Sequence, residues 1–154
     1  MVSDVGRITI GSAIRIRLAT VADGAAIAAM AGELGYEIKS EEAASRLISL
    51  PTTDDLLVAT SGDQVVGWIQ LSIAQSVAGA THIQIVGLVV REGWRGMGVA
   101  RRLMKHAELW ARQHGASTIL VRSGSQREGA HRFYEALGYH ELKTQKVLLK
   151  ELGQ

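Results

Sequence analysis

Residues 89–103 read VVREGWRGMGVARRL and are the most informative stretch of the sequence. An apolar run typical of a β-strand ends at Val90, a glycine-rich turn follows, and an amphipathic helix then begins. Glycines allow close backbone approach, and the free amides at a helix start form an anion site. Arg101 and Arg102 fall in the first helical turn, where cations oppose the helix dipole unless an anion lies nearby. The stretch therefore predicts a phosphorylated ligand, although a tight strand-to-helix connection would use a similar turn.

The glycine spacing excludes two common phosphate loops. The sequence contains no Gly-x-x-x-x-Gly-Lys-Ser/Thr, so the protein is not a P-loop nucleotide hydrolase. It also lacks a Gly-x-Gly-x-x-Gly turn with an acidic residue about 20 positions later, the pattern of a dinucleotide-binding fold. Residues 95–100 instead have the form Arg-x-x-Gly-x-Ala.

Length and composition favour a single globular domain without a membrane span. The chain has 154 residues, of which 47% are hydrophobic, and it contains no run of about 18 apolar residues. No signal peptide is visible, so we expect a cytoplasmic protein. The formal charge of +2 includes no concentrated basic face, which argues against nucleic acid as a partner. We expect residues 1–12 to be a flexible leader and residues 13–154 to form one domain.

Cysteine is absent from the chain. This excludes disulfides, thiolate metal sites and a cysteine nucleophile, and with them an acyl-cysteine intermediate. The five histidines show no metal-ligand spacing, so no metal site is expected.

The hydrophobic pattern predicts elements in the order β-α-α-β-β-β-α-β-α-β. This order is mixed and does not alternate as a doubly wound fold does. The expected strands cover residues 14–18, 56–60, 65–74, 83–90, 118–122 and 139–149. The expected helices run from a cap at Thr20 or Asp23 to Leu34, and over residues 40–50, 98–113 and 128–137. The third helix carries Val99, Leu103, Ala107 and Trp110 along one face.

A second motif, AHRFYEALGY, occupies residues 130–139. Together with the turn at residues 95–100, it resembles the two hallmark motifs of the GNAT superfamily of N-acetyltransferases, in the same order and over nearly the whole chain. The resemblance implies a mixed α/β fold, in which a twisted and splayed sheet of six or seven strands is flanked by helices. It also implies that acetyl-CoA is the cosubstrate and that an amine is the acceptor.

The resemblance also assigns roles to individual residues. The pantetheine arm would pair with the strand at Leu88, Val89 and Val90. Tyr134 would be the catalytic residue, as the general acid that protonates the departing thiolate. The loop that holds the pyrophosphate would consist of Arg95, Gly96, Met97, Gly98, Val99, Ala100 and Arg101.

The base that deprotonates the acceptor amine is not defined by the sequence. Many relatives carry Glu at the position of Gln84, and glutamine cannot act as a base. Glu33, His82 and Glu92 are other candidates, each with an ordinary surface or turn role as the alternative. Loss of the proton to a chain of waters serves equally well.

Further positions depart from the family pattern or stay open. Arg127 stands where relatives often place Asn, and it could contact a phosphate, contact the substrate or simply start a helix. His131 is expected on the helix surface, with a place beside the cofactor as the alternative. The acceptor pocket is expected around the first two helices, with Tyr36 and an acidic pair of Glu33 and Glu37, and around residues 143–146.

Three functional readings follow. The first is an acetyl-CoA-dependent N-acetyltransferase that acts on the primary amine of a small molecule by direct attack in a ternary complex. The second is an acyl-CoA-binding domain with weak catalysis, and the third is a protein or peptide N-acetyltransferase. A homodimer is also expected, on the family resemblance and on the apolar segment at residues 147–149.

Overall fold

The computed structural model describes residues 14–124 and 126–153. These residues form two compact units, with the division between Val121 and Arg122. The predicted leader at residues 1–12 lies outside the described residues, and the prediction of a single domain at 13–154 stays a prediction.

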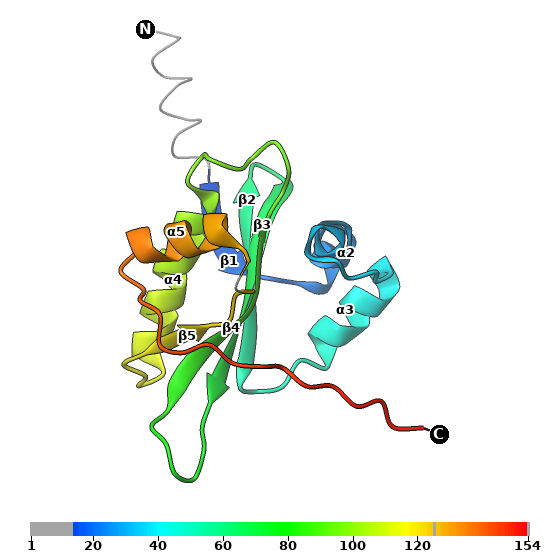
Figure 1. Ribbon diagram of the computed structural model, residues 1–154. Coiled ribbons are helices and arrows are strands. Elements are labelled where there is room, and N and C mark those ends of the chain that lie inside the picture. Colours follow the sequence, from blue (N-terminus) through cyan, green and yellow to red (C-terminus); the bar gives the residue numbers. More distant parts are fainter. Residues whose placement is uncertain (1–13, 125, 154) are drawn as a thin grey trace, which may run out of the picture. The chain divides into compact units, whose positions relative to one another are not determined.

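The first unit is built on a five-stranded sheet in the order β1-β2-β3-β4-β5 (Figure 1). Neighbouring strands are antiparallel from β1 to β4, and β5 runs parallel to β4. The predicted mixed α/β class is therefore confirmed. The strands are β1 (Ile14–Leu18), β2 (Asp54–Ser61), β3 (Gln64–Ala74), β4 (His82–Val90) and β5 (Ile119–Val121).

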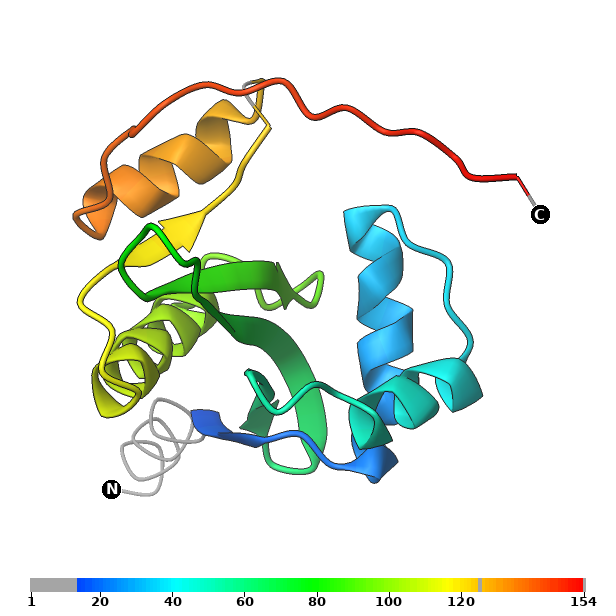
Figure 2. The same cartoon turned by 90° about the horizontal axis from the view of Figure 1, so that it is seen from below.

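Helices cover both faces of this sheet. Two 3-10 turns, η1 (Val21–Asp23) and η2 (Gly32–Leu34), flank α2 (Gly24–Ala31), so the first predicted helix is present in three consecutive pieces. Figures 1 and 2 show α2 and α3 (Ser40–Ile48) on one side of the sheet and α4 (Val99–Gln113) on the other.

The start of the first helical segment is fixed by a buried carboxylate. Asp23 is 5% exposed and accepts two hydrogen bonds from Arg17 of β1, at 2.7 and 2.9 Å. It also accepts the amide of Thr20 at 2.7 Å, as an acidic residue does in a capping box. The hydrogen bonds from Arg17 lower the pKa of Asp23, against the opposing effect of burial. The carboxylate therefore joins β1 to the helix that follows.

The long helix α4 packs on the sheet with the face that its sequence predicts. Val99, Leu103, Ala107 and Trp110 are all buried. Trp110 also donates its indole N–H to Asp55 Oδ2 at 2.8 Å, which attaches the far end of α4 to β2.

Close packing beneath α4 depends on Gly67 of β3. A Cβ atom there would lie 3.1 Å from both the Val89 carbonyl and Val99 Cγ1, and 3.3 Å from Leu103 Cδ1. The absence of a side chain lets the first turn of α4 lie directly on the sheet.

The second unit contains α5 (Glu128–Ala136), and none of its residues is buried. The predicted strand at 139–149 is wrong, because residues 139–153 form no strand or helix. Val147, Leu148 and Leu149 are 88%, 88% and 87% exposed. A strand requires a hydrogen-bonded neighbour, and three consecutive apolar residues do not alternate between two faces. The described sheet accordingly has five strands, and the predicted six or seven are not present.

Candidate active site

The sheet opens between β4 and β5. Only residues 83–85 of β4 pair with β5, whereas residues 87–90 pair on their other side with β3 alone. A register shift opposite Gln70 and Leu71 leaves Val86 as an extra residue, which is a β-bulge. The predicted splay is therefore present within the described sheet. The backbone of the predicted pantetheine segment, Leu88, Val89 and Val90, lies along this open side.

The open stretch of β4 leads directly into the glycine-rich loop. Gly93, Gly96 and Gly98 have φ angles of +89°, +76° and +85°, which side-chain-bearing residues rarely adopt. Gly98 is the N-cap residue of α4, and its carbonyl accepts the amide of Arg102 at 3.1 Å.

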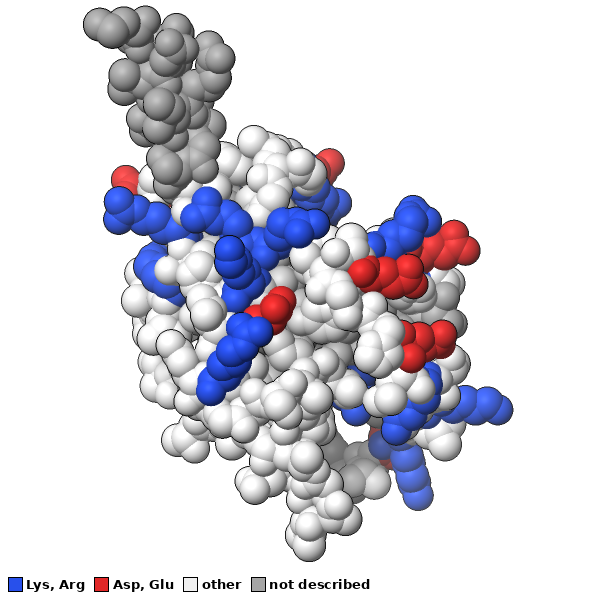
Figure 3. All heavy atoms as spheres, turned by 90° about the vertical axis from the view of Figure 1, so that its left-hand side faces the viewer, with Lys and Arg blue, Asp and Glu red and all other residues white. Residues whose placement is uncertain are grey.

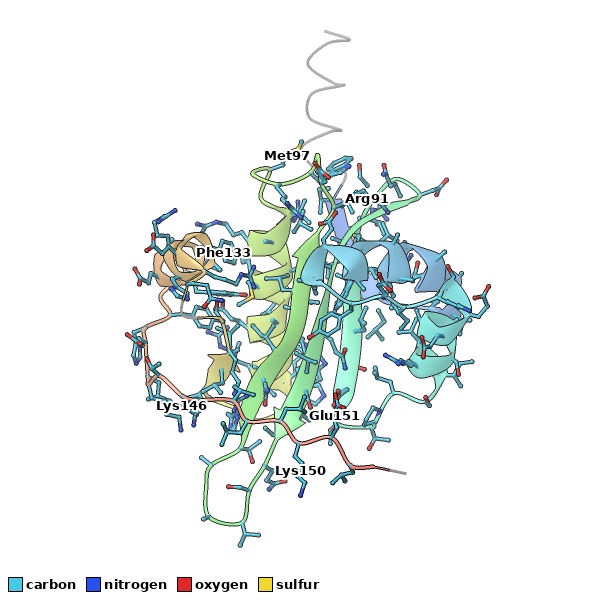
Figure 4. All side chains as sticks on the ribbon, turned by 45° about the vertical axis from the view of Figure 1, so that its right-hand side comes forward. Arg91, Met97, Phe133, Lys146, Lys150 and Glu151 are labelled. Carbon is cyan, nitrogen blue, oxygen red and sulfur yellow. The ribbon has the colours of Figure 1, made fainter. Side chains whose placement is uncertain are left out.

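The amides that precede this first helical bond have no partner within the helix. They belong to Val99, Ala100 and Arg101, in the positively polarised first turn. Val99 is 1% exposed, so its side chain anchors the turn while its N–H stays at the helix end. Met97 is 57% exposed and lies at the outer end of the loop (Figure 4).

The four arginines near the loop divide into two pairs. Arg91 donates its amide to the Val66 carbonyl at 2.8 Å and its Nε to the Val65 carbonyl at 3.0 Å. Arg95 donates its Nε to the Val90 carbonyl at 3.2 Å and forms an ion pair with Glu33.

The second pair has no comparable contacts. The side chains of Arg101 and Arg102 are exposed and make no hydrogen bond or ion pair with the described residues. Figure 3 shows Lys and Arg side chains gathered in the upper part of the face that it presents. Two cations thus stand at a helix start where the dipole disfavours them, and an anion would relieve that repulsion.

The base candidates differ in how far their side chains are already engaged. Both carboxylate oxygens of Glu33 accept hydrogen bonds, one from the Glu92 amide at 3.3 Å and one from Arg95. Gln84 and His82 are half-buried on β4, toward the end away from the loop. Glu92 is exposed in the loop. Both carboxylate oxygens of Glu33 therefore already accept hydrogen bonds. Gln84, His82 and Glu92 do not form one cluster.

The link between α2 and α3 carries the predicted acceptor residues. Gly35 ends η2 with a φ of +88°, and Tyr36 behind it is 68% exposed. A shallow, open hollow on this link is lined by Glu37, Ile38, Lys39, Glu41 and Glu42.

Beneath the link, Leu34 and the ring of Trp68 cover Gly87 of β4. A Cβ atom at Gly87 would lie 3.2 Å from the ring and 3.9 Å from Leu34 Cδ1. The face of β4 at Gly87 is therefore already covered by these two apolar side chains.

Tyr134 lies on α5, in the second unit. Its ring makes edge contacts with Phe133 and Tyr139, with centroid distances of 5.1 and 5.7 Å. Burial raises the pKa of Tyr134, and the charge of Arg127 opposes that shift. The phenol therefore keeps its proton through the neutral range. His131 donates its Nε2–H to the Gly124 carbonyl at 2.9 Å, a local contact between α5 and the segment before it.

Neither a metal cluster nor a membrane-spanning helix is found in residues 14–124 and 126–153. No three metal-binding side chains gather there. No helix in the same residues has both the length and the apolar character needed to cross a bilayer.

Comparison with known proteins defines the family. The profile of the acetyltransferase (GNAT) family matches residues 24–139. This match covers most of the chain and includes both motifs. The chain belongs to the GNAT acetyltransferase family.

Individual relatives are distant. Rat N-acetyltransferase 8B is 29% identical over 85 residues, a match that spans 54% of this chain but only 38% of the rat protein. An aminoglycoside N(6')-acetyltransferase type 1 from Acinetobacter baumannii is 26% identical over 102 residues, which cover 64% of this chain and 70% of that enzyme.

The fold has a close counterpart among solved structures. The ribosomal-protein-alanine N-acetyltransferase from Brucella melitensis biovar Abortus 2308 superposes with a TM-score of 0.75 at 18% identity. The superposition covers 90% of this chain and 100% of that structure. At this identity the likeness concerns the fold alone.

The glycine-rich turn lies between β4 and α4, as the sequence predicted, but the motif did not reveal its contacts. Sequence reasoning assigned Arg95 to the cofactor and considered Glu33 as a base, whereas the two side chains bind each other. They stand 62 positions apart in the sequence. No local spacing signals such a pair, and only the packing of η2 against the loop reveals it.

Proposed function

We propose that this GNAT-family protein is an acetyl-CoA-dependent N-acetyltransferase that acetylates the primary amine of a small molecule. The observation that carries the proposal is the open stretch of β4 that leads into the loop amides at the start of α4, beside Arg101 and Arg102. Acetyl-CoA would supply the activated acyl group.

The residues present fit the chemistry of that donor. The free peptide groups of residues 86–90 offer strand-like hydrogen bonds to the amides of a pantetheine arm. The amides of Val99, Ala100 and Arg101 fit a pyrophosphate at a helix N-terminus. Arg101 and Arg102 would neutralise the phosphate charge. The cofactor-binding set remains residues 88–90 and 95–101.

Acyl transfer would proceed by direct attack, because the chain has no cysteine to carry the acyl group. The amine nitrogen would form its bond to the acetyl carbon as the carbon–sulfur bond breaks, and it would then release its second excess proton to water. Tyr134 would give its phenolic proton to the sulfur and would be reprotonated from solvent. An alkylamine has an ordinary pKa near 10.4, so its proton must first be removed. With both Glu33 oxygens engaged and Gln84 in the family's acidic position, we assign that proton to water.

The acceptor is proposed to be a small molecule that carries more than one amino group. The Acinetobacter baumannii relative is an aminoglycoside acetyltransferase. In this chain, the hollow on the α2–α3 link is lined by three carboxylates and one lysine, Glu37, Glu41, Glu42 and Lys39. A cationic acceptor would be attracted to such a surface.

A thiol-release assay with acetyl-CoA tests the proposal. The panel should contain monoamines, linear polyamines, aminoglycosides and peptides with a free N-terminus. We expect turnover with a polycationic small amine. CoA binding without turnover on the whole panel would indicate the weakly catalytic binding domain instead. Preference for peptides would indicate a protein acetyltransferase.

We also propose that two copies of the chain associate and that the enzyme acts in the cytoplasm. Association would cover the exposed apolar residues at 147–149. Analytical ultracentrifugation at micromolar concentrations tests the dimer, and a monomer throughout that range would remove it. Cell fractionation tests the location.

A further inference from the structure

Glu33 connects η2 to the glycine-rich loop at two points. Its Oε1 accepts the backbone N–H of Glu92 at 3.3 Å, and its Oε2 accepts Nη2 of Arg95. These contacts join the first helical segment to residues 59 and 62 positions further along the chain. One side chain therefore holds both the entry to the loop and its middle.

Arg95 continues this connection to the sheet. Its Nε donates to the carbonyl of Val90, the last residue of β4, at 3.2 Å. A single guanidinium thus joins η2, the loop and the end of β4. The planar fork of arginine suits such a contact, because it presents several donors in fixed directions. Arg91 fixes the first residue of the loop to β3 in the same manner.

These contacts act on a loop that is otherwise exposed and rich in glycine. Gly93, Gly96 and Gly98 carry no side chain, and no atom lies within 4 Å of where a Cβ would stand at any of them. Glycine loses more backbone freedom on ordering than any other residue. A ligand that had to order this loop itself would bind more weakly, whereas a loop already held in place avoids that cost.

We propose that Glu33 is a positioning residue for the donor: it holds Arg95 and the Glu92 amide so that residues 96–101 keep their anion-binding conformation before acetyl-CoA arrives. Arg95 then serves the loop through its contacts with Glu33 and the Val90 carbonyl, and Arg101 and Arg102 supply the charge that faces the phosphates. This inference rests on the proposed donor site. It also assigns Glu33 a role other than that of a base.

The direction in which CoA affinity changes when Glu33 is replaced distinguishes a positioning role from simple electrostatics. Glu33 is an anion close to a site proposed for an anion. If only the repulsion between these charges mattered, removing the charge of Glu33 should tighten CoA binding. It would also free Arg95 to approach the phosphates. Loss of positioning predicts the opposite, weaker binding. Electrostatics and positioning therefore predict opposite changes in the measured CoA affinity of Glu33→Gln.

Stability should change little in either case. The side chains of Arg95 and Glu33 are 58% and 26% exposed, and ion pairs of such exposure contribute little to folding. A change in CoA affinity without a large change in melting temperature would therefore report on the loop and not on the fold.

The experiment measures CoA binding by calorimetry, and the melting temperature, for the wild-type protein and five variants. Glu33→Gln removes the charge and keeps the shape, and Glu33→Asp keeps the charge and shortens the reach. Glu108→Gln is the matched control, because Glu108 loses the same charge from the same unit, has no hydrogen-bond or ion-pair partner among the described residues, and lies on α4 beyond its first turns. Arg95→Ala and the double variant Glu33→Gln/Arg95→Ala complete a thermodynamic cycle.

We expect Glu33→Gln to weaken CoA binding about tenfold, within the range of coupling energies between residues in contact. Glu33→Asp should also weaken it, and Glu108→Gln should leave it unchanged or slightly tighter. The double variant should bind no worse than Arg95→Ala alone, because the two side chains act as one unit. Unchanged or tighter binding by Glu33→Gln, or additive losses in the cycle, would overturn the inference. Wild-type protein that binds no CoA would overturn the proposed function itself.

Discussion

The helices α4 and α5 each contain part of one of the two sequence motifs, and their residues are buried to very different extents. Six residues of α4 are buried: Val99, Leu103, Met104, Ala107, Trp110 and Ala111. None of the residues of α5 is buried. The loop before α4 is joined to β3, β4 and η2 by the arginine contacts. At the start of α5, the Arg127 amide and His131 Nε2 both donate to the carbonyl of Gly124, a few residues earlier in the chain.

This difference shows that a motif can be recognised whether or not its helix contributes to a core. The α4 motif combines the proposed binding pattern with a core pattern. The α5 motif carries the proposed general acid, Tyr134, on a helix with no buried residue. Substitutions around α4 should therefore alter stability and donor binding, and substitutions in α5 should alter chemistry.

The largest expected effect comes from α5. Tyr134→Phe removes the proposed general acid and keeps the ring that packs against Phe133 and Tyr139. We expect kcat to fall by roughly 10²- to 10⁴-fold, the usual contribution of general acid–base catalysis. The melting temperature and the affinity for CoA should stay unchanged. Steady-state kinetics, with Tyr139→Phe as the matched control, measures the effect.

The pH dependence sharpens the same prediction. Because burial raises the pKa of Tyr134, its protonated form should persist above the ordinary phenol value of about 10. Activity should therefore show no alkaline loss from this group below that pH. Normal turnover by Tyr134→Phe, or a defect confined to CoA affinity, would show that α5 has no catalytic role.

The second effect concerns packing beneath α4. Gly67→Ala places a methyl group 3.1 Å from a carbonyl oxygen and from Val99 Cγ1, which is tighter than ordinary contact, so these neighbours must give way slightly. Overpacking of this kind costs about 1–3 kcal/mol. Urea denaturation should show the loss as a lower midpoint. An unchanged midpoint would mean that α4 is not packed as tightly against β3 as described.

The third effect concerns the loop backbone. Gly98→Val forces a β-branched residue into a φ of +85°, where left-handed backbone costs an L-residue about 1–2 kcal/mol. If the loop relaxes to a different conformation, CoA affinity should fall by about tenfold or more. Gly115→Val is the control, because Gly115 has a φ of +75° and lies beyond the other end of α4. Equal CoA affinities for the two variants would contradict the assignment of the loop.

The smallest expected effect is a slight gain in stability. Gly129→Ala introduces a methyl group into the first turn of α5, where only Arg132 Nη2 approaches, at 4.0 Å. Replacing glycine at a compatible position stabilises proteins by about 0.4–1 kcal/mol through the unfolded chain. Thermal denaturation should show no loss of stability. A clear destabilisation would place α5 under packing constraints like those of α4.

Much of the fold could be predicted because its signals are local. The apolar face of α4, the hairpin between β2 and β3, and the stop at Gly35 all depend on residues close together in sequence. The segment at residues 139–149 was predicted wrongly because a strand does not depend on local residues alone. Its composition suits a strand, but a strand also depends on a partner that composition does not specify.

The candidate site was also predictable only where its features depend on neighbouring residues in the sequence. The positive φ angles at Gly96 and Gly98 agree with a glycine pattern that is visible in the sequence. The ion pair of Glu33 with Arg95 depends on how η2 packs against the loop. Single-sequence reasoning therefore assigned those two side chains to separate roles.

The placement of the three tryptophans gives the protein a built-in optical reporter. Trp68 and Trp110 are buried, at 7% and 8% exposure, whereas Trp94 is only half-buried and stands inside the loop, with its amide donating to the Arg91 carbonyl at 2.9 Å. A neutral collisional quencher should therefore reach Trp94 before the other two. The quenchable fraction of the intrinsic fluorescence would follow the loop without any label, and ligands could be ranked by how far they shield that one indole.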